Sequence, residues 1–258
     1  MNFNPNESSL HLLFREDTFK YCIVSEKNTI VSLKTFHENN LDTLKTLFSE
    51  QNELNQSYKK VRVSVYDPNR TLVPVDFFDF NELEILYAWQ DQSNISGKLL
   101  YDFIEPINYY NIYQIDTHLF DFVRSQYPRS LFQSSTSILI DRLLLEDAEE
   151  GTSQVYMSLG SSYMEVAVVA NGTLQFTNSF FVQTAEDILY YLMSTIEEGK
   201  IDLMEDEIFL MDNFEKVEQF GVLKNYLASL QEAKLNAKYE LDGSLSIKSV
   251  CHHDILSI

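Results

Sequence analysis

The chain has 258 residues, of which 45% are hydrophobic and 22% charged, a composition typical of a globular protein with one large or two modest domains. Its 39 Asp and Glu residues against 19 Lys and Arg give a net charge of −20, so the average electrostatic field repels nucleic-acid backbones and anionic lipid headgroups. No apolar run is long enough to span a bilayer and no signal-peptide pattern opens the chain. We therefore expect a cytoplasmic protein that binds no nucleic acid and does not insert into membranes.

Basic residues gather in one stretch, where Lys59, Lys60 and Arg62 lie together and Arg70 follows. A local basic patch for nucleic acid or anionic lipid could exist at this place despite the average field. The solvated ends of strands and loops give the same pattern, however, and this is the interpretation we expect.

In chain order, alternating apolar residues first predict three strands, leucines at helical spacing then predict a helix, and a fourth strand ends at Asp67. The next stretch, about residues 68–116, is less regular and is interpreted as an insertion. It contains an extended segment, a helix and aromatic-rich strands interrupted by Pro106, at residues 71–74, 81–90 and 98–115. Two further helices are predicted at residues 118–126 and 136–145.

The second half repeats the first at an offset of 145 residues. Leu10 in the first strand recurs as Val155, and Val63 in the fourth strand recurs as Ile208. A constant offset across strands and a helix favours duplication over chance alternation. We therefore predict an α/β fold with mixed sheets, in two related halves at residues 1–148 and 149–258.

The most informative stretch is residues 155–182, which predicts three strands connected by two turns. The first turn, Gly160-Ser161-Ser162, contains only small residues and has the shape of a phosphate-binding turn. Ser158 immediately precedes it along the strand. Together, Ser158, Gly160, Ser161 and Ser162 could bind a small anion through amides and hydroxyl groups, although a bare strand turn explains them as well.

Several short segments carry a resemblance to known proteins. They are Thr71-Leu72-Val73-Pro74, 155–160, Asn171-Gly172 with Leu174, Asn178-Ser179-Phe180, Ala185-Glu186-Asp187 and Tyr190-Tyr191. With the element order and the repeat, they resemble the actin-like ATPase superfamily, which includes actin, sugar kinases and Hsp70 chaperones. The second half also resembles an uncharacterised bacterial domain-of-unknown-function family with this fold. The resemblance implies two duplicated ribonuclease H-like halves, each with a phosphate hairpin, enclosing a nucleotide.

The chain departs from the superfamily pattern where the chemistry lies. The resemblance implies Asp-X-Gly at the end of the first strand of each half, because phosphoryl transfer needs a carboxylate to hold Mg²⁺. Here Ser158-Leu159-Gly160 and Leu13-Phe14-Arg15 stand at these places, and 210–214 lacks the Gly-Gly pair of the adenosine segment. Glu16 and Asp17 follow the first site, but we expect them to be solvated turn residues. We therefore predict no catalytic residue and no cofactor.

Two other groups of polar residues have simpler explanations than chemistry. Thr184 and Asp187 are typical of a capping box at a helix start, rather than part of a catalytic carboxylate pair. Cys251-His252-His253-Asp254 contains metal-ligand types, but adjacent strand residues point to opposite faces, so we expect a tail and no metal site.

Aromatic residues are plentiful, and most should pack in the core. Tyr87, Trp89, Tyr109, Tyr110 and Tyr113 are weak candidates for a protein-binding surface, because Tyr and Trp are enriched at interfaces. The prediction is a catalytically inactive, actin-like pseudo-ATPase that acts as an adaptor, scaffold or regulatory partner of another protein, with a homodimer as one possibility. An atypical ATPase or nucleotide or phosphate sensor, and a small-ligand binding module, stay open as alternatives.

Overall fold

The computed structural model describes residues 3–38, 40–89, 95–145, 153–199, 201–202, 207–211, 230–232 and 240–241. The chain divides into two compact units between Ile138 and Leu139, and the short strand at residues 240–241 belongs with the first unit. The predicted boundary between residues 148 and 149 lies outside the described residues and stays a prediction.

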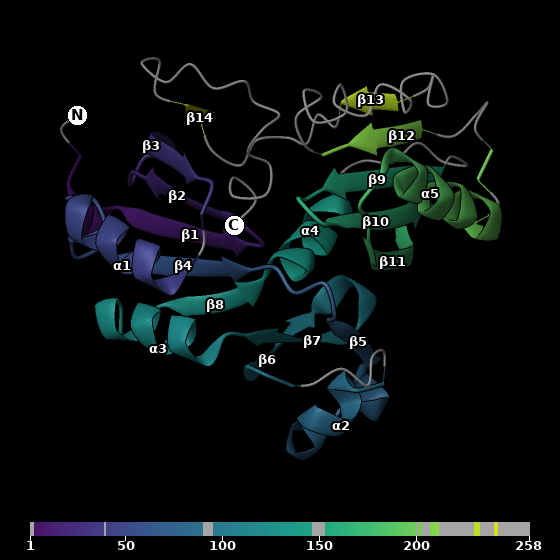
Figure 1. Cartoon of the computed structure of the whole chain (residues 1–258), viewed down its shortest axis with the longest axis horizontal. Helices are drawn as coiled ribbons and strands as arrows, with labels where there is room; N and C mark the ends of the chain where they lie inside the picture. Colours follow the sequence, from purple (N-terminus) through teal and green to yellow (C-terminus); the bar gives the residue numbers. More distant parts are fainter. Residues whose placement is uncertain are drawn as a thin grey trace. The chain divides into compact units, whose positions relative to one another are not determined.

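The first unit is built on a six-stranded mixed sheet (Figure 1). Its first three strands form an antiparallel meander, and the remaining strands add in parallel to its two edges. The order across the sheet is β14 (Glu240–Leu241), β3 (Thr29–Phe36), β2 (Thr18–Val24), β1 (Ser9–Arg15), β4 (Lys60–Val65) and β8 (Leu131–Ser134).

Two helices, α1 (Leu41–Glu50) and α3 (Thr117–Gln126), cover one face of this sheet. Leu44 and Phe48 of α1 are buried against alternate residues of β1 and β2, such as Leu12 and Phe19. The Asn40 side chain accepts a hydrogen bond from the amide of Thr43 and thereby caps the start of α1. Burial of the apolar face of each helix thus holds the main core of the unit.

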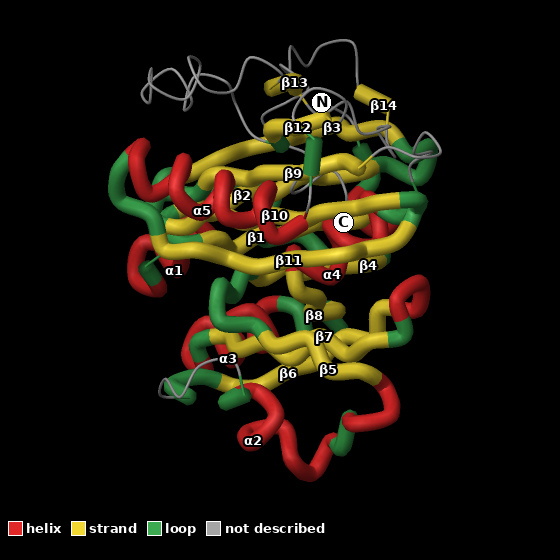
Figure 2. Tube along the Cα trace, turned by 90° about the vertical axis from the view of Figure 1, so that its right-hand side faces the viewer, coloured by secondary structure: helices red, strands yellow, loops and turns green. Residues whose placement is uncertain are grey.

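The insertion predicted at residues 68–116 forms a second, three-stranded antiparallel sheet in the order β5, β7, β6. In Figures 1 and 2 this small sheet lies between β8 and α2. Pro106 lies in the single helical turn Glu105–Ile107 between β6 and β7, which explains the predicted interruption. In chain order, the elements of the insertion are β5 (Thr71–Pro74), η2 (Val75–Phe77), η3 (Phe80–Glu82), α2 (Leu83–Tyr87), β6 (Lys98–Ile104), η4 (Glu105–Ile107) and β7 (Tyr109–Ile115).

The second unit contains a five-stranded sheet whose first three strands again form an antiparallel meander. Helix α5 (Ala185–Gly199) packs on it through Ile188, Leu192 and Ile196. Helix α4 (Ser135–Leu143) contains the junction between the units. The sheet order is β11 (Thr173–Phe181), β10 (Tyr163–Ala170), β9 (Ser153–Leu159), β12 (Glu207–Leu210) and β13 (Leu230–Glu232).

The two sheets share their topology down to an irregularity. The order β3-β2-β1-β4-β8 matches β11-β10-β9-β12-β13, with parallel and antiparallel pairs in the same places. The pairing of β2 with β3 shifts register between Ile23 and Val24, and that of β10 with β11 shifts between Val168 and Val169. These positions are again 145 residues apart, so the predicted α/β fold with two duplicated halves is confirmed.

Local predictions differ from the structure mainly in the insertion and its edge. The helix predicted at residues 81–90 is a helical turn, η3, followed by the short α2, because Leu86 and Tyr87 turn into the small core of the insertion. The four-residue strand β8 was not predicted, since too few residues alternate there to show a period. None of the helices in the described residues combines the length and apolar character of a membrane span.

Candidate functional site

The turn between β9 and β10 is the predicted anion site of the second unit. Ser158 is buried near the end of β9, and Gly160, Ser161 and Ser162 connect the strands. The Gly160 amide donates to the carbonyl of Tyr163 over 2.7 Å, and the Ser162 carbonyl accepts from the amide of Val182 over 2.9 Å. The structure therefore brings all four predicted residues to one turn.

The amide of Gly160 is already used within this turn, and it cannot point at an anion while it closes the hairpin. Gly160 also does not have a positive φ, in contrast with Asn171 and Gly172, which have φ of 52° and 68° at the next turn. The predicted turn at Asn171-Gly172 is confirmed, because these are the conformations that two-residue hairpin turns require. At Gly160 the backbone conformation makes no such demand for glycine.

A buried carboxylate that the sequence analysis missed lies beside this turn. Glu165 of β10 is 3% exposed and pairs directly with Ser158 of β9 on one side and Ser179 of β11 on the other. Residues paired in this way have Cβ atoms about 5 Å apart on one face of the sheet. The signal was a single acid within the apolar strand from Met164 to Val169.

The equivalent turn of the first unit is shorter. β1 ends at Arg15 and β2 begins at Thr18, so Glu16 and Asp17 alone make the connection. Glu16 has φ of 37°, and Thr18 Oγ1 donates to Asp17 Oδ1 over 3.1 Å. The Arg15 guanidinium lies 4.8 Å from the centre of the Tyr66 ring. A two-residue turn without glycine leaves no loop to wrap around a phosphate.

These turns do not fit a Mg²⁺-bound nucleotide. The metal would require a carboxylate at the end of the first strand of a hairpin, where Ser158 and Leu13 stand instead. Glu165 is the nearest acid by strand pairing, but its side chain is buried. In the described part of the chain, no group of three His, Cys, Asp or Glu side chains is arranged to hold a metal ion. Residues 251–254, where we expected a tail and no metal site, lie outside that part, as do residues 212–214 of the segment at 210–214.

Asp67, the buried acid of the first unit, joins parts of the fold through hydrogen bonds. It follows β4, and its carboxylate accepts hydrogen bonds from the Tyr87 hydroxyl at 2.9 Å and from the amides of Gln114 at 2.8 Å and Asn69 at 3.0 Å. Burial raises the pKa of Asp67 above its ordinary value, although these hydrogen bonds and the charge of Arg70 oppose the shift. Asp67 therefore attaches the three-stranded sheet to the end of β4.

Two more polar contacts attach the same sheet. Asp102 of β6 accepts from the Ser134 amide over 2.7 Å, and the Asn111 amide group donates to Ser137 Oγ over 2.9 Å. Hydrogen bonds from buried groups specify one docking position, because misplacement would leave a buried polar atom without a partner. The insertion is therefore fixed to its unit rather than hinged on it.

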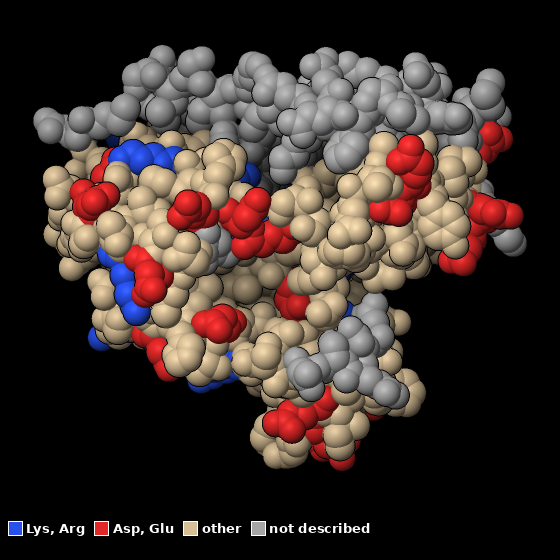
Figure 3. Space-filling model, in the orientation of Figure 1, with Lys and Arg blue, Asp and Glu red and all other residues tan. Residues whose placement is uncertain are grey.

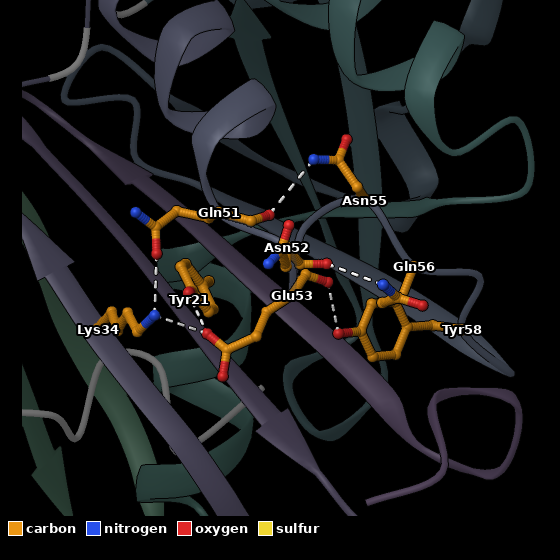
Figure 4. Close-up of polar contacts among 8 residues, drawn as sticks. All are labelled: Tyr21, Lys34, Gln51, Asn52, Glu53, Asn55, Gln56 and Tyr58. Carbon is orange, nitrogen blue, oxygen red and sulfur yellow. Dashed lines mark hydrogen bonds and ion pairs between the residues drawn. The ribbon is translucent and has the colours of Figure 1, made fainter. Parts of the chain in front are cut away.

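A third polar cluster holds the loop after α1 against the sheet (Figure 4). The carboxylate of Glu53 accepts from the Tyr21 hydroxyl over 2.5 Å and lies 2.7 Å from Lys34 Nζ. Lys34 also donates to the side-chain oxygen of Gln51 over 2.9 Å. Burial alone would raise the pKa of Glu53, but hydrogen bonds from Lys34, Tyr21 and Ser32 and the charge of Lys34 outweigh it, and the pKa is lowered.

The outer face of the three-stranded sheet carries a contiguous group of aromatic rings, which we call the aromatic surface: Phe78, Tyr101, Phe103 and Tyr110. Phe78 stacks on Tyr110 with ring centres 3.7 Å apart, and the rings of Tyr101 and Phe103 lie 5.9 and 5.0 Å from that of Tyr110. Tyr101 is 47% exposed and Phe103 46%. Several large apolar side chains of one sheet face are thus in contact with water.

The five aromatic residues predicted as interaction candidates separate into two groups. Tyr87 and Tyr113 are both buried. Tyr87 belongs to the small apolar core of the insertion, and Tyr113 belongs to the main core of the first unit. Trp89 is 58% exposed, and Tyr109 and Tyr110 are half-buried. Of the five, Tyr110 belongs to the aromatic surface, whose other members the sequence analysis did not single out. Alternation along β6 could have indicated Tyr101 and Phe103.

Comparison with solved structures supports the fold. The chain is similar to a protein with an actin-like ATPase fold and unknown function from Bacteroides thetaiotaomicron VPI-5482, with 21% identity, a TM-score of 0.80, and coverage of 98% of this chain and 95% of that one. A PilM-PilN type IV pilus biogenesis complex matches at 11% identity and a TM-score of 0.60, covering 98% and 96%. The ethanolamine utilization protein EutJ from Carboxydothermus hydrogenoformans matches at 8% and 0.51, covering 91% and 87%.

The protein has an actin-like ATPase fold, as the resemblance of its sequence implied. No match was found among functionally curated proteins. A family model described as "Protein of unknown function (DUF3822)" matches residues 2–230. The chain therefore belongs to the DUF3822 family.

Proposed function

We propose that this protein is a catalytically inactive, cytoplasmic member of the actin-like fold that works through protein contacts, as an adaptor, scaffold or regulatory partner. Two features of the hairpin turns support the loss of catalysis. Ser158 and Leu13 stand where a metal-binding carboxylate would be needed, and the Gly160 amide is bonded within its own turn. A protein of this fold that no longer binds nucleotide can still act through the contacts that its surface makes with other proteins.

The observation that carries the protein-contact part of the proposal is the aromatic surface. Exposed Tyr101 and Phe103 lie on a sheet face, and Phe77 and Phe80, close to Phe78 in the sequence, are also exposed. Single exposed apolar residues are ordinary, but contiguous apolar patches mark interaction sites. The insertion is attached by the buried hydrogen bonds of Asp67, so this surface is presented rigidly.

The distribution of charge supports one chemistry for the partner. Exposed acids lie close to Phe78 in the sequence, namely Asp76, Asp79, Glu82 and Glu84, and Figure 3 shows acidic side chains gathered around the α2 end of the insertion. No Lys or Arg occurs between Arg70 and Lys98. An apolar surface with an acidic rim complements a protein segment that carries both apolar and basic side chains. The similarity of fold to a PilM-PilN complex, which pairs two proteins, agrees with this proposal.

The first experiment tests inactivity. Isothermal titration of the purified chain with ATP, ADP and Mg²⁺ should show no tight binding, and ATP turnover should stay at the level of a protein-free control. Saturable binding or turnover that Gly160→Val or Ser158→Ala removes would contradict the proposal. Because circular dichroism verifies that each variant folds, loss through unfolding is recognised.

The second experiment tests the partner. Affinity purification from the native cell, followed by cross-linking mass spectrometry, compares the wild type with Tyr101→Ser/Phe103→Ser. The matched control is Phe181→Ser, which removes a similarly exposed strand aromatic, 52% exposed, from the second unit. We expect a protein cross-linked near β6 through a basic, apolar segment, retained by the control and lost with the double variant. Recovery of the same proteins with all three chains would refute the aromatic surface as the contact.

The buried Glu165 favours one alternative, a nucleotide or phosphate sensor centred on Ser158, Gly160, Ser161 and Ser162. A carboxylate paired with Ser158 could hold a cation there if the strand end opened. In that case Glu165→Gln, which keeps the shape of the side chain and removes its charge, would abolish Mg²⁺-dependent nucleotide binding. Nucleotide binding that is unchanged in Glu165→Gln would exclude this role.

A further inference from the structure

A pocket of about 480 Å³ lies at the end of the first-unit sheet away from the β1–β2 turn. Lys59, Lys60, Arg62 and His11 line it, together with Glu7 and Glu26 at the ends of neighbouring segments. β1 runs from Ser9 to Arg15, so the pocket and the turn are separated by about six residues, or about 20 Å of extended strand. It is therefore distinct from the hairpin site predicted by the fold.

Strand register brings the basic side chains together. β1 and β4 are parallel, with Ser9 paired to Lys60 and His11 paired to Arg62. Residues two apart on a strand point to the same face, so Lys60, Arg62 and His11 share the face opposite the α1 core. The Lys59 amide donates to the carbonyl of Ser8 over 3.0 Å, which fixes the start of β4 beside β1.

The basic side chains of the pocket form no ion pair with the two acids that also line it. Among the described residues, Lys59, Lys60 and Arg62 form no ion pair or side-chain hydrogen bond, and Glu7 and Glu26 lie beyond ion-pair distance of them. Burial, and then the neighbouring charge of Arg62, lower the pKa of Lys60. In a chain with a net charge of −20, three cations in one pocket are a local exception.

We propose that this pocket binds a small phosphate ester that carries hydroxyl groups. The guanidinium of Arg62 and the ammonium groups of Lys59 and Lys60 line the same pocket. Several cationic donors suit a dianionic tetrahedral group better than a single carboxylate. Phosphate alone would fill a small part of the volume, which is within the range of pockets for small organic ligands. The carboxylates of Glu7 and Glu26 can accept hydrogen bonds from hydroxyl groups on the remainder of the ligand.

The test is isothermal titration of the purified full chain with glucose 6-phosphate and AMP, without Mg²⁺. Glucose and adenosine are the uncharged controls, and inorganic phosphate and succinate are the anions without an ester. We expect at least one ester to bind with one site per chain, more tightly than inorganic phosphate or succinate. Arg62→Ala and Lys60→Ala should each weaken binding about tenfold or more, since a hydrogen bond to a charged group contributes about that factor.

The matched control is Lys27→Ala, which removes the same charge from the exposed turn between β2 and β3 but does not line the pocket. It should bind as the wild type does. Equal binding by Arg62→Ala and Lys27→Ala, or no binding of any phosphate ester by the wild type, would overturn the proposal. Gly160→Val distinguishes ligand binding in this pocket from nucleotide binding at the β9–β10 turn. Phosphate esters should still bind the pocket in that variant, whether or not the protein is an ATPase. Circular dichroism verifies the fold of each chain.

Discussion

Substitution of Glu53 should show how strongly the loop after α1 is held to the sheet. Glu53→Ala removes the acceptor of the Tyr21 hydroxyl, and Tyr21 is fully buried, so a donor is left without a partner at a cost of about 1 to 3 kcal/mol. The contact with Lys34 adds little, about 0.5 kcal/mol, because the two side chains are 41% and 26% exposed. We expect the free energy of unfolding to fall by about 2 kcal/mol.

Urea denaturation followed by circular dichroism measures this loss, and a double-mutant cycle assigns it. In the Tyr21→Phe background no hydroxyl remains to be orphaned, so Glu53→Ala should cost about 1 kcal/mol less than in the wild type. Lys45→Ala is the control, because its contact with Asp42 at 3.8 Å is on the surface and should contribute almost nothing. The same cost in both backgrounds would refute the role of the hydroxyl bond.

Four further predictions follow from individual residues. The pKa of Glu53 is lowered in the folded state, so its contribution is present above the ordinary value of 4.5 and disappears as pH falls through the folded value; the cost of Glu53→Ala should therefore shrink in denaturation experiments in acid. Gly172→Ala should cost about 1 kcal/mol because φ is 68°, whereas Gly160→Ala should cost less than about 0.5 kcal/mol, and equal shifts in melting temperature would contradict this. Thr184→Ala should cost about 1 kcal/mol and speed hydrogen exchange in the first turn of α5, unless its cap is dispensable. Asp67→Ala should expose the three-stranded sheet to limited proteolysis, because three donors lose their acceptor; unchanged cleavage within residues 68–116 would show that other contacts suffice.

Features fixed by neighbouring residues were predictable from the sequence. The capping box is confirmed, since the Asp187 amide donates to Thr184 Oγ1 over 3.2 Å and Asp187 accepts from the amides of Gln183 and Thr184. The strands of both halves were predictable because buried strands carry many apolar residues. The recurrence of this apolar pattern at a fixed offset showed that the two halves are related. The absence at Ser158 of the acid that the superfamily resemblance implies was likewise visible in the sequence.

Features that depend on strand register were not predictable in this way. Lys60 is exposed at the start of β4, as expected of a solvated strand end. Only the parallel pairing of β4 with β1 places Lys60 and Arg62 beside His11 in one pocket. Glu165 could be recognised as unusual, but its position opposite Ser158 depends on the pairing of β9 with β10. Register is a tertiary property, because strands distant in sequence must first meet.

The two sheets share a register shift at equivalent positions, between Ile23 and Val24 and between Val168 and Val169. Residues 145 apart in β2 and β10 therefore correspond one to one before and after the shift. Under that correspondence Glu165 is the counterpart of Lys20, which pairs with Leu13 as Glu165 pairs with Ser158. One copy thus carries a negative charge, and the other a positive charge, at the same point of the same sheet. The copies have kept a common geometry down to a bulge while inverting the electrostatics beside each turn, so any ligand they ever bound symmetrically could no longer meet the same field in both.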